Sequence, residues 1–212
     1  MEIMKRQTIQ SGIYLIIDPS MEEEILLSKL NFIVKEEIAA IQVWDNFKNE
    51  QNIEKLLLKI DEKASPNNIP IIINNRWELL KQSPLDGIHF DEIPENFNDI
   101  KKEINRDFIA GITCNNELSI IEYAEKHQFD YISFCSMFPS KTANSCELVD
   151  FETVQKAKNI FSGKIFLAGG IDLGNIENLS QINYDGIAVI SGIMSVENPS
   201  ETIKKYHQKI KK

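Results

Sequence analysis

Eight short apolar runs recur along the chain, and a segment of helical character follows each one. The runs cover residues 13–17, 39–43, 69–73, 87–90, 108–112, 131–134, 165–168 and 186–190. Short apolar runs that alternate with helical segments predict parallel strands buried on both faces and joined by right-handed crossovers. Eight such units predict a (β/α)8 barrel, a single α/β domain over residues 1–212. A doubly wound open sheet is the alternative, but no G-x-G-x-x-G motif follows the first run.

The helical segments are less uniform than the apolar runs. They are expected over residues 21–37, 53–60, 77–81, 99–104, 116–127, 151–160, 176–182 and 200–210. The fourth is the poorest, because Pro94 and the asparagines at 96 and 98 leave room for only about one turn. A further short helix is expected over 192–197. In barrels, a short extra helix after the last strand often completes a phosphate site.

The last two apolar runs both end in small residues. Gly169-Gly170 follows the first of them, and Ser191-Gly192 follows the second. Glycines at the carboxyl end of a strand let backbone N–H groups approach an anion, and the next helix N-terminus favours negative charge. The pair of strand ends therefore predicts a phosphate cradle. The alternative is that Gly-Gly forms only a tight turn.

Polar side chains follow most of the other runs. Because the carboxyl ends of parallel strands meet at one end of a barrel, these residues are expected to form its mouth. They are rich in amides and hydroxyls and include Gln42, Trp44, Asn74, Asn75, His89, Asp91, Thr113, Ser140 and Thr142. His89 has the alternative of packing against a neighbouring loop. Trp44 can stack on a flat heteroaromatic ring, cap the barrel or cover a dimer surface.

Charge and composition exclude several classes of partner. The net charge is −9 and the isoelectric point is near 5.0, which argues against nucleic-acid binding. Apolar runs are too short for a membrane span, and the first ten residues lack the apolar segment of a signal peptide. The cysteines at 114, 135 and 146 are odd in number and contain no C-x-x-C motif. A soluble cytoplasmic protein with reduced thiols is expected.

Six segments in this order and spacing resemble one known family. They are GIYLIID, IIINNRWELL, DGIHF, DYISFCSMFPSKT, LAGGI and DGIAVISGI. The chain resembles thiamine-phosphate synthase and its sister group, the TenI-type thiazole tautomerases, over nearly its full length. The resemblance implies a (β/α)8 barrel, a homodimer and Mg²⁺. It also implies a synthase that joins hydroxymethylpyrimidine diphosphate to a thiazole phosphate and releases pyrophosphate.

The same resemblance assigns roles to individual residues. The thiazole phosphate would lie in a cradle of Gly169, Gly170, Ile190 and Ser191. Substrate-binding positions that match the family pattern are Gln42, Asn74, Ser140 and Thr142, and Asn75 and Trp44 lie beside them. Thr113 stands where the family usually has serine, and with His89 it is a candidate catalytic residue. Asp91 is the candidate metal ligand.

The chain departs from the family pattern at charged positions. Trp44 and Asn46 replace an arginine and a lysine, and Ala143 replaces a second lysine. Asn75 and Pro94 stand where the family has carboxylates for the metal, and an amide binds Mg²⁺ less well than a carboxylate. Without these charges the diphosphate loses much of what would hold it.

Three functions stay open on the sequence alone. The first is a thiamine-phosphate synthase-like transferase with a rebuilt diphosphate site. The second is a metal-free thiazole tautomerase, although Asn115 stands where that branch has histidine. The third is a phosphate-ligand-binding relative without turnover. Other phosphate-binding barrels share the glycine signals, but they would need a catalytic group on an early strand, where Asp18 is the only candidate.

Overall fold

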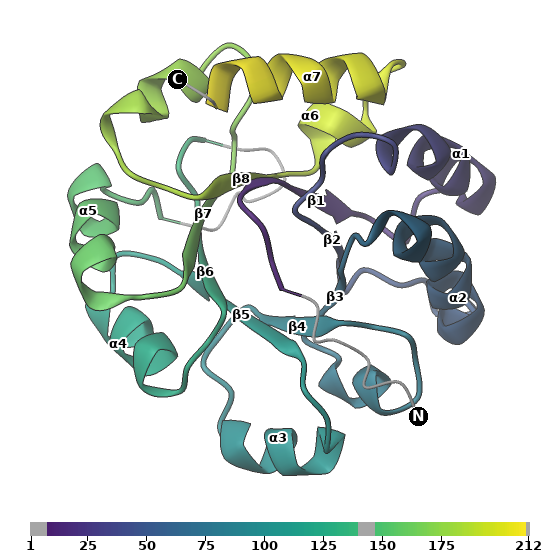
Figure 1. Ribbon diagram of the computed structural model, residues 1–212, viewed down its shortest axis with the longest axis horizontal. Coiled ribbons are helices and arrows are strands. Elements are labelled where there is room, and N and C mark those ends of the chain that lie inside the picture. Colours follow the sequence, from purple (N-terminus) through teal and green to yellow (C-terminus); the bar gives the residue numbers. More distant parts are fainter. Residues whose placement is uncertain (1–7, 140–146, 211–212) are drawn as a thin grey trace.

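Eight parallel strands form a closed barrel in the order of the chain. The computed structural model describes residues 8–139 and 147–210. Figure 1 looks along the barrel and shows the ring of strands inside a layer of helices. The strands are β1 (Gly12–Ile17), β2 (Ala40–Val43), β3 (Ile71–Asn74), β4 (Gly87–Phe90), β5 (Ile109–Cys114), β6 (Tyr131–Cys135), β7 (Lys164–Ala168) and β8 (Gly186–Val189). The predicted (β/α)8 barrel is confirmed.

The outer layer mixes α-helices with shorter 3₁₀ segments. The helices are α1 (Glu23–Ile33), α2 (Ile53–Ala64), α3 (Phe97–Ile104), α4 (Leu118–Lys126), α5 (Phe151–Ile160), α6 (Ser191–Met194) and α7 (Pro199–Ile210). The 3₁₀ segments are η1 (Ser65–Asn67), η2 (Trp77–Lys81) and η3 (Ile176–Gln181). The segments expected at 77–81 and 176–182 are thus helical, but they form 3₁₀ segments rather than α-helices. The predicted extra helix occurs earlier, as α6.

Two apolar layers hold the barrel together. The larger lies between the strands and the helices, where residues such as Leu56, Leu57 and Ile60 of α2 are almost fully buried. The smaller fills the inside of the ring with bulky side chains, including Tyr14, Tyr131 and Phe166. Aromatic side chains at the centre make the interior a packed core rather than a pore.

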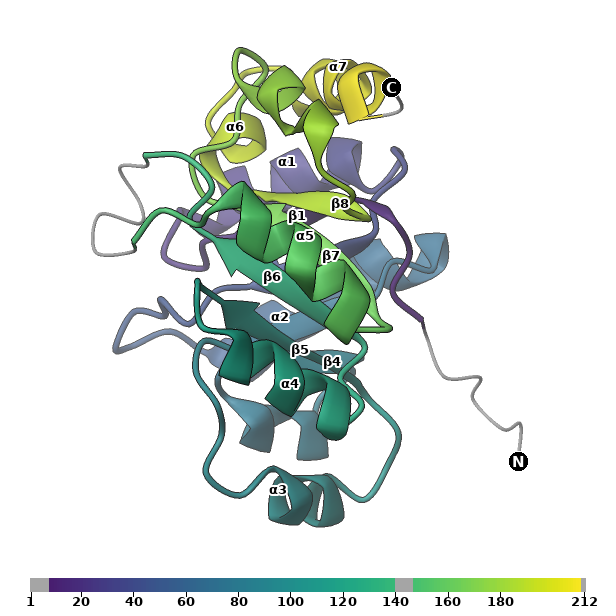
Figure 2. The same ribbon diagram turned by 90° about the vertical axis from the view of Figure 1, so that its left-hand side faces the viewer.

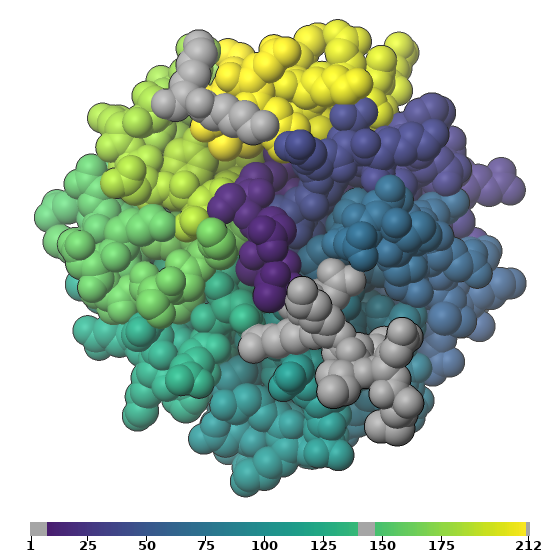
Figure 3. Space-filling view, viewed as in Figure 1, coloured from purple at the N-terminus to yellow at the C-terminus, as the bar shows by residue number. Residues whose placement is uncertain are grey.

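The segment before β1 closes one end of this interior. Residues 8–11 run across the amino-terminal ends of the strands, as the space-filling view shows (Figure 3). Ile9 in this segment is buried and packs with the inner cluster. Figure 2 shows the ring from the side, with the carboxyl ends of the strands at the opposite end of the barrel. The carboxyl end is therefore the open end, where functional side chains can meet a ligand.

An aspartate precedes each of three even-numbered strands and ties it to the strand before. The Oδ2 atoms of Asp86 and Asp130 accept hydrogen bonds from backbone N–H groups that open the preceding strands, at Ile71 and Ala110. Asp185 does the same with the N–H of Ile165 at 3.0 Å. The repeated D-G or D-Y dipeptide in the sequence thus fixes register at the base of the barrel.

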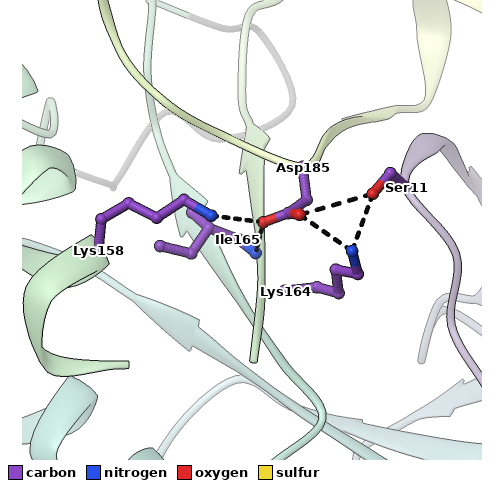
Figure 4. A network of polar contacts seen from close by, with 5 residues as sticks. All are labelled: Ser11, Lys158, Lys164, Ile165 and Asp185. Atoms are coloured by element: carbon purple, nitrogen blue, oxygen red, sulfur yellow. Dashed lines mark hydrogen bonds and ion pairs between the residues drawn. The ribbon is translucent and has the colours of Figure 1, made fainter. Parts of the chain in front are cut away.

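Asp185 has the richest set of partners of the three (Figure 4). Lys158 Nζ lies 2.7 Å from Oδ2, and Lys164 Nζ and Ser11 Oγ lie 3.1 and 3.5 Å from Oδ1. Burial raises the pKa of Asp185, but hydrogen bonds from Lys158, Ile165 and Lys164 outweigh it, and the pKa ends below its usual value. The ionised form is therefore the one that stabilises the fold.

Replacing Asp185 by asparagine is expected to lower the free energy of unfolding at pH 7 by about 2 kcal/mol, because two charged partners lose their carboxylate. The lowered pKa also sets the pH dependence of this stabilisation. The contribution of Asp185 to the free energy of unfolding is present above about pH 4 and is lost as the pH falls through its folded-state pKa. Urea unfolding measures the change. Glu152→Gln, which breaks an exposed pair with Lys156, is the control and should leave stability unchanged. Equal effects of the two variants would contradict the prediction.

Candidate functional site

A small pocket lies where β7 and β8 end. Its volume is about 290 Å³, and its lining includes Gly169, Gly170, Ile190, Ser191 and Gly192. Among the described residues, no hydrogen bond uses the backbone N–H of Gly169, Gly170, Ser191 or Gly192. Unpaired N–H groups around a concave site are what an anion requires. The four residues predicted to form a phosphate cradle therefore border one cavity.

The two glycines of the cradle have conformations that other residues rarely adopt. The φ angles are +84° at Gly169 and +66° at Gly170. A Cβ atom would lie 2.1 Å from Ser136 Oγ at the first position and 2.5 Å from the carbonyl oxygen of Phe138 at the second. Gly-Gly therefore makes a positive-φ turn and also lets the loop after β6 approach β7.

A carboxylate in the same pocket points back into its own loop. Asp172 lines the cavity, and its Oδ1 atom accepts hydrogen bonds from the N–H groups of Gly174 and Asn175 at 2.7 and 3.0 Å. Asn175 in turn donates from Nδ2 to the carbonyl oxygen of Gly170 at 2.7 Å. This loop holds the shape of the turn and keeps part of the negative charge engaged away from an incoming anion.

Two side-chain amides hold Asp91 at the ends of β3 and β4. Asn74 Nδ2 donates to Oδ1 at 3.0 Å, and Asn75 Nδ2 donates to Oδ2 at 2.8 Å. Asn75 Oδ1 also accepts from the N–H of Asp91 at 3.0 Å, and Asn74 Oδ1 accepts from the N–H of Asp45 at 3.4 Å. Both amide oxygens are therefore in use, and the amides turn nitrogen toward the carboxylate.

A cation stands beside this group. Arg76 Nε lies 2.5 Å from Asp45 Oδ1, and the guanidinium lies over the ring of Phe47. The Arg76 side chain remains 43% exposed. Trp44 is half-buried in the same loop, and its backbone N–H donates to the carbonyl oxygen of Ile17. The mouth therefore has a positive charge next to β3, but a carboxylate already neutralises much of it.

A continuous chain of hydrogen bonds crosses the inside of the barrel. Tyr14 Oη lies 2.8 Å from Gln42 Oε1 and 2.6 Å from Tyr131 Oη. His89 Nδ1 lies 2.9 Å from Tyr131 Oη, and His89 Nε2 lies 2.9 Å from Thr113 Oγ1. The imidazole is 4% exposed, and its ring stacks on Tyr131. Five strands thus contribute one polar side chain each to a buried relay.

The ionisation of the relay is set by burial. Desolvation lowers the pKa of His89 from 6.5 to about 4, and the nearby negative charge of Asp91 only partly opposes it. Burial likewise raises the pKa of Tyr14 and of Tyr131 above the usual value for a phenol. At neutral pH the imidazole is therefore neutral and both phenols keep their protons.

Sequence comparisons agree with this architecture. The family model described as thiamine monophosphate synthase matches residues 13–193. The chain belongs to the thiamine monophosphate synthase family. A thiamine-phosphate synthase of Clostridium tetani is 33% identical over 131 residues, which are 62% of each chain. One of Hydrogenobaculum is 28% identical over 203 residues, or 94% of each chain. The solved thiamine phosphate pyrophosphorylase of Pyrococcus furiosus shares the fold, with a TM-score of 0.78, 20% identity and 97% of each chain covered.

The synthase-family positions fall into two groups in the structure. Gly169, Gly170, Ile190 and Ser191 border the cradle, whereas Gln42, Asn74, His89 and Thr113 carry polar atoms at or just inside the mouth. Ser140 and Thr142 lie outside the described residues. His89 points into the barrel and bonds to Tyr131 and Thr113 rather than packing against a loop. The catalytic and binding roles of these residues stay predictions.

Sequence reasoning missed the two tyrosines that connect the relay. Tyr14 and Tyr131 lie inside the apolar runs, and a strand buried on both faces shows no polar alternation that would separate them from the core. One signal was present: Tyr14 is the one polar-tipped residue in its run, Tyr131 shares its run only with Ser133, and a buried hydroxyl normally needs a partner. No buried side-chain N or O atom in the described part of the chain lacks one.

Proposed function

We propose that the chain is a thiamine-phosphate synthase that binds a thiazole phosphate in the cradle and couples hydroxymethylpyrimidine diphosphate to it. This proposal rests on one pocket, which is bordered by Gly169, Gly170, Ser191 and Gly192. The backbone N–H groups of these residues donate no hydrogen bond to any other described residue. Main-chain N–H groups bind a phosphate without any need for a positively charged side chain. The relatives of the same family named as thiamine-phosphate synthases support this choice of ligand.

The other half of the mouth limits the rate of this reaction. Loss of pyrophosphate requires that developing negative charge be neutralised by cations. Trp44 and Asn46 carry no charge, and Arg76 is already paired with Asp45. The cradle therefore supports binding of the thiazole phosphate better than it supports departure of the diphosphate, and we expect turnover to be slow.

The residues around Asp91 do not form a site for a resident Mg²⁺ ion. Magnesium takes several oxygen ligands in octahedral arrangement. Around Asp91 the neighbouring amides present nitrogen, and their oxygens accept backbone N–H groups instead. In the part of the chain that the structure describes, no group of three histidine, cysteine, aspartate or glutamate side chains could hold a metal. Asp91 stays the predicted ligand, but the amides of Asn74 and Asn75 beside it supply none of the further oxygens that the ion needs.

The turnover test uses purified protein with both substrates and excess Mg²⁺ to complex the diphosphate. Thiamine phosphate should form slowly, with one pyrophosphate released for each product. Thiazole phosphate binding without any product at high enzyme concentration would establish the non-catalytic relative instead. If calorimetry shows no binding of thiazole phosphate, both the phosphate-binding role of the cradle and the proposed synthase activity are wrong.

A second candidate function rests on the contact between Thr113 and His89. A hydroxyl 2.9 Å from a neutral, buried imidazole is an arrangement that can move a proton, as a thiazole tautomerase must. A thiazole carboxylate phosphate tautomer would then isomerise without metal and without the pyrimidine. A rate that Thr113→Ala and His89→Ala leave unchanged would remove this candidate.

Replacing Ser191 by aspartate is expected to weaken thiazole phosphate binding by more than about tenfold, because a carboxylate then faces the phosphate. Aspartate suits the first turn of a helix, so α6 should still form. Isothermal calorimetry measures the affinity. Ser195→Asp is the matched control, since Ser195 is exposed at the end of the same short helix and does not line the pocket. Equal losses of affinity in Ser191→Asp and Ser195→Asp would contradict phosphate binding in the cradle.

The homodimer stays a prediction of the family resemblance, and the cytoplasmic location stays a prediction of the sequence composition. Within the described ranges, no helix is long and apolar enough to pass through a lipid bilayer. A homodimer is proposed on the resemblance and a cytoplasmic location on the cysteine pattern. Ile25 and Phe32 on the outer face of α1 are 50% and 54% exposed. Sedimentation at micromolar concentration tests the dimer, and a monomer there would remove that part of the proposal.

A further inference from the structure

The relay through the barrel joins two residues that the proposed function places at the mouth. Gln42 comes from β2 and Thr113 from β5, and their side chains are linked only through the relay members between them in the described part of the chain. Tyr14 and Tyr131 form the middle of the relay and are 2% and 0% exposed. Neither tyrosine lines the cradle. The relay thus offers a route by which buried groups can act on the mouth.

The direction of every hydrogen bond in the relay follows from its first one. Gln42 Oε1 can only accept, so the Tyr14 hydroxyl donates to it. Tyr14 then has no proton left for Tyr131, so Tyr131 donates to Tyr14. Tyr131 must therefore accept from His89 Nδ1–H. In a neutral imidazole the other nitrogen is then an acceptor, and Thr113 donates its proton to His89 Nε2.

We propose that Tyr14 and Tyr131 are positioning residues that fix the tautomer of His89 and thereby the polarity of Thr113. This inference rests on the proposed function for its link to substrate. Because the Thr113 hydroxyl donates its hydrogen bond to His89 Nε2, it presents only oxygen lone pairs to a ligand at the mouth. The ligand group that meets Thr113 must then be a hydrogen-bond donor, such as an amino group on a heterocycle, and not a second acceptor.

Packing around the relay supports a fixed geometry. The rings of Tyr14 and Tyr131 lie 5.4 Å apart, and Phe166 packs against both of them, at 5.3 and 5.7 Å. His89 stacks on Tyr131 with an interplanar angle of 19°. Aromatic rings held on several sides have few alternative rotamers, so the hydroxyls stay in line. The relay is therefore a rigid arrangement with a single free variable, the direction of its protons.

Removing one remote hydroxyl should reverse that direction. In Tyr14→Phe, the Tyr131 hydroxyl loses its acceptor and turns to donate to His89 Nδ1. His89 then carries its proton on Nε2 and donates to Thr113, whose own proton is free to face the mouth. Tyr14 makes no hydrogen bond to His89 among the described residues, so a change in the His89 tautomer would travel through Tyr131 alone.

Two-bond ¹H–¹⁵N correlation spectra of labelled protein at pH 7 test this directly. The chain has three histidines, and His89→Gln identifies the signals of His89 by their loss. The wild type should show the Nδ1–H tautomer, and both Tyr14→Phe and Tyr131→Phe should show the Nε2–H tautomer. Tyr123→Phe, whose hydroxyl bonds only weakly to Pro94 on the outside of the barrel, should show no change. A wild-type Nε2–H tautomer, or no change in Tyr14→Phe, overturns the proposal.

The activity of the same variants separates this inference from the proposed function. With both substrates, Tyr14→Phe should lower kcat on the order of tenfold, with the KM for thiazole phosphate nearly unchanged because the cradle is intact. The loss in Tyr14→Phe/Thr113→Val should not exceed that in Thr113→Val alone. If the wild type shows no turnover, the proposed synthase function is wrong, and the tautomer spectra alone then decide whether Tyr14 and Tyr131 orient His89. If kcat of Tyr14→Phe/Thr113→Val falls below that of Thr113→Val by the full effect of Tyr14→Phe, then Tyr14 does not act through Thr113, and the proposal is overturned.

Discussion

Replacing Gly111 by alanine is expected to lower the free energy of unfolding by about 3 kcal/mol, the upper end for overpacking in a core. Gly111 lies on β5 beneath the ring of Tyr131, and a Cβ atom there would lie 1.9 Å from Cζ of that ring. The ring cannot move away, because Tyr14 and Phe166 pack against it. The same clash should displace the Tyr131 hydroxyl from His89, so the His89 tautomer should change as well.

Chemical denaturation of four variants isolates this clash. Gly174→Ala is the control, because Gly174 is exposed and its added Cβ would meet only Asp172 Oδ1 at 3.1 Å. Tyr131→Leu removes the ring and is itself destabilising. In Gly111→Ala/Tyr131→Leu the total loss should be smaller than the sum of the two single losses, because the methyl group then occupies space left by the ring. Strict additivity would show that the glycine has another role.

The barrel could be predicted because its evidence is repeated eight times. Every apolar run corresponds to a strand within one or two residues at each end. The base of the barrel repeats as well: Asp86, Asp130 and Asp185 open even strands in the same way. Repetition of this kind fixes a topology even where single segments, such as η2 and η3, form 3₁₀ turns in place of α-helices.

The turn at the end of β7 could also be predicted, since its signal is local, whereas its role in binding phosphate stays a prediction. Gly169 and Gly170 have positive φ angles, a conformation that only glycine adopts at little cost. The arrangement around Asp91 could not be predicted. It depends on Asn75 taking a φ of +59°, and on which end of each amide faces the carboxylate. Loop conformation decides both, and the residue types alone do not.

The relay was hidden for a different reason. Its middle members lie in strands buried on both faces, where a tyrosine reads as one more large core residue. Only the closure of the barrel brings β1, β4 and β6 to a common centre. Only the strand register places the hydroxyl oxygens of Tyr14 and Tyr131 at 2.6 Å from each other. A sequence can therefore indicate which residues reach the mouth more readily than which buried residues control them.

Stability should fall with acidification in a window set by His89. Its pKa in the folded state is about 4, below its ordinary value of 6.5, because burial disfavours the charged ring. Between these two values the unfolded chain binds a proton that the native protein does not, so the free energy of unfolding rises with pH. The contribution is constant above about pH 7, is lost as the pH falls from 6.5 to about 4, and amounts to about 3 kcal/mol.

The measurement compares urea unfolding of the wild type with that of His89→Gln from about pH 7.5 to about pH 4. The difference in free energy of unfolding between the two proteins should shrink steadily as the pH falls below 6.5, because only the wild type carries the buried ring. His127→Gln is the matched control: burial, with Lys126 and Lys101, also lowers the pKa of His127, but His127 is on the outside of the barrel. Its difference from the wild type should change far less. A difference for His89→Gln that is independent of pH would mean that the ring ionises freely in the native barrel, and a water-accessible His89 could not hold Thr113 in a single polarity.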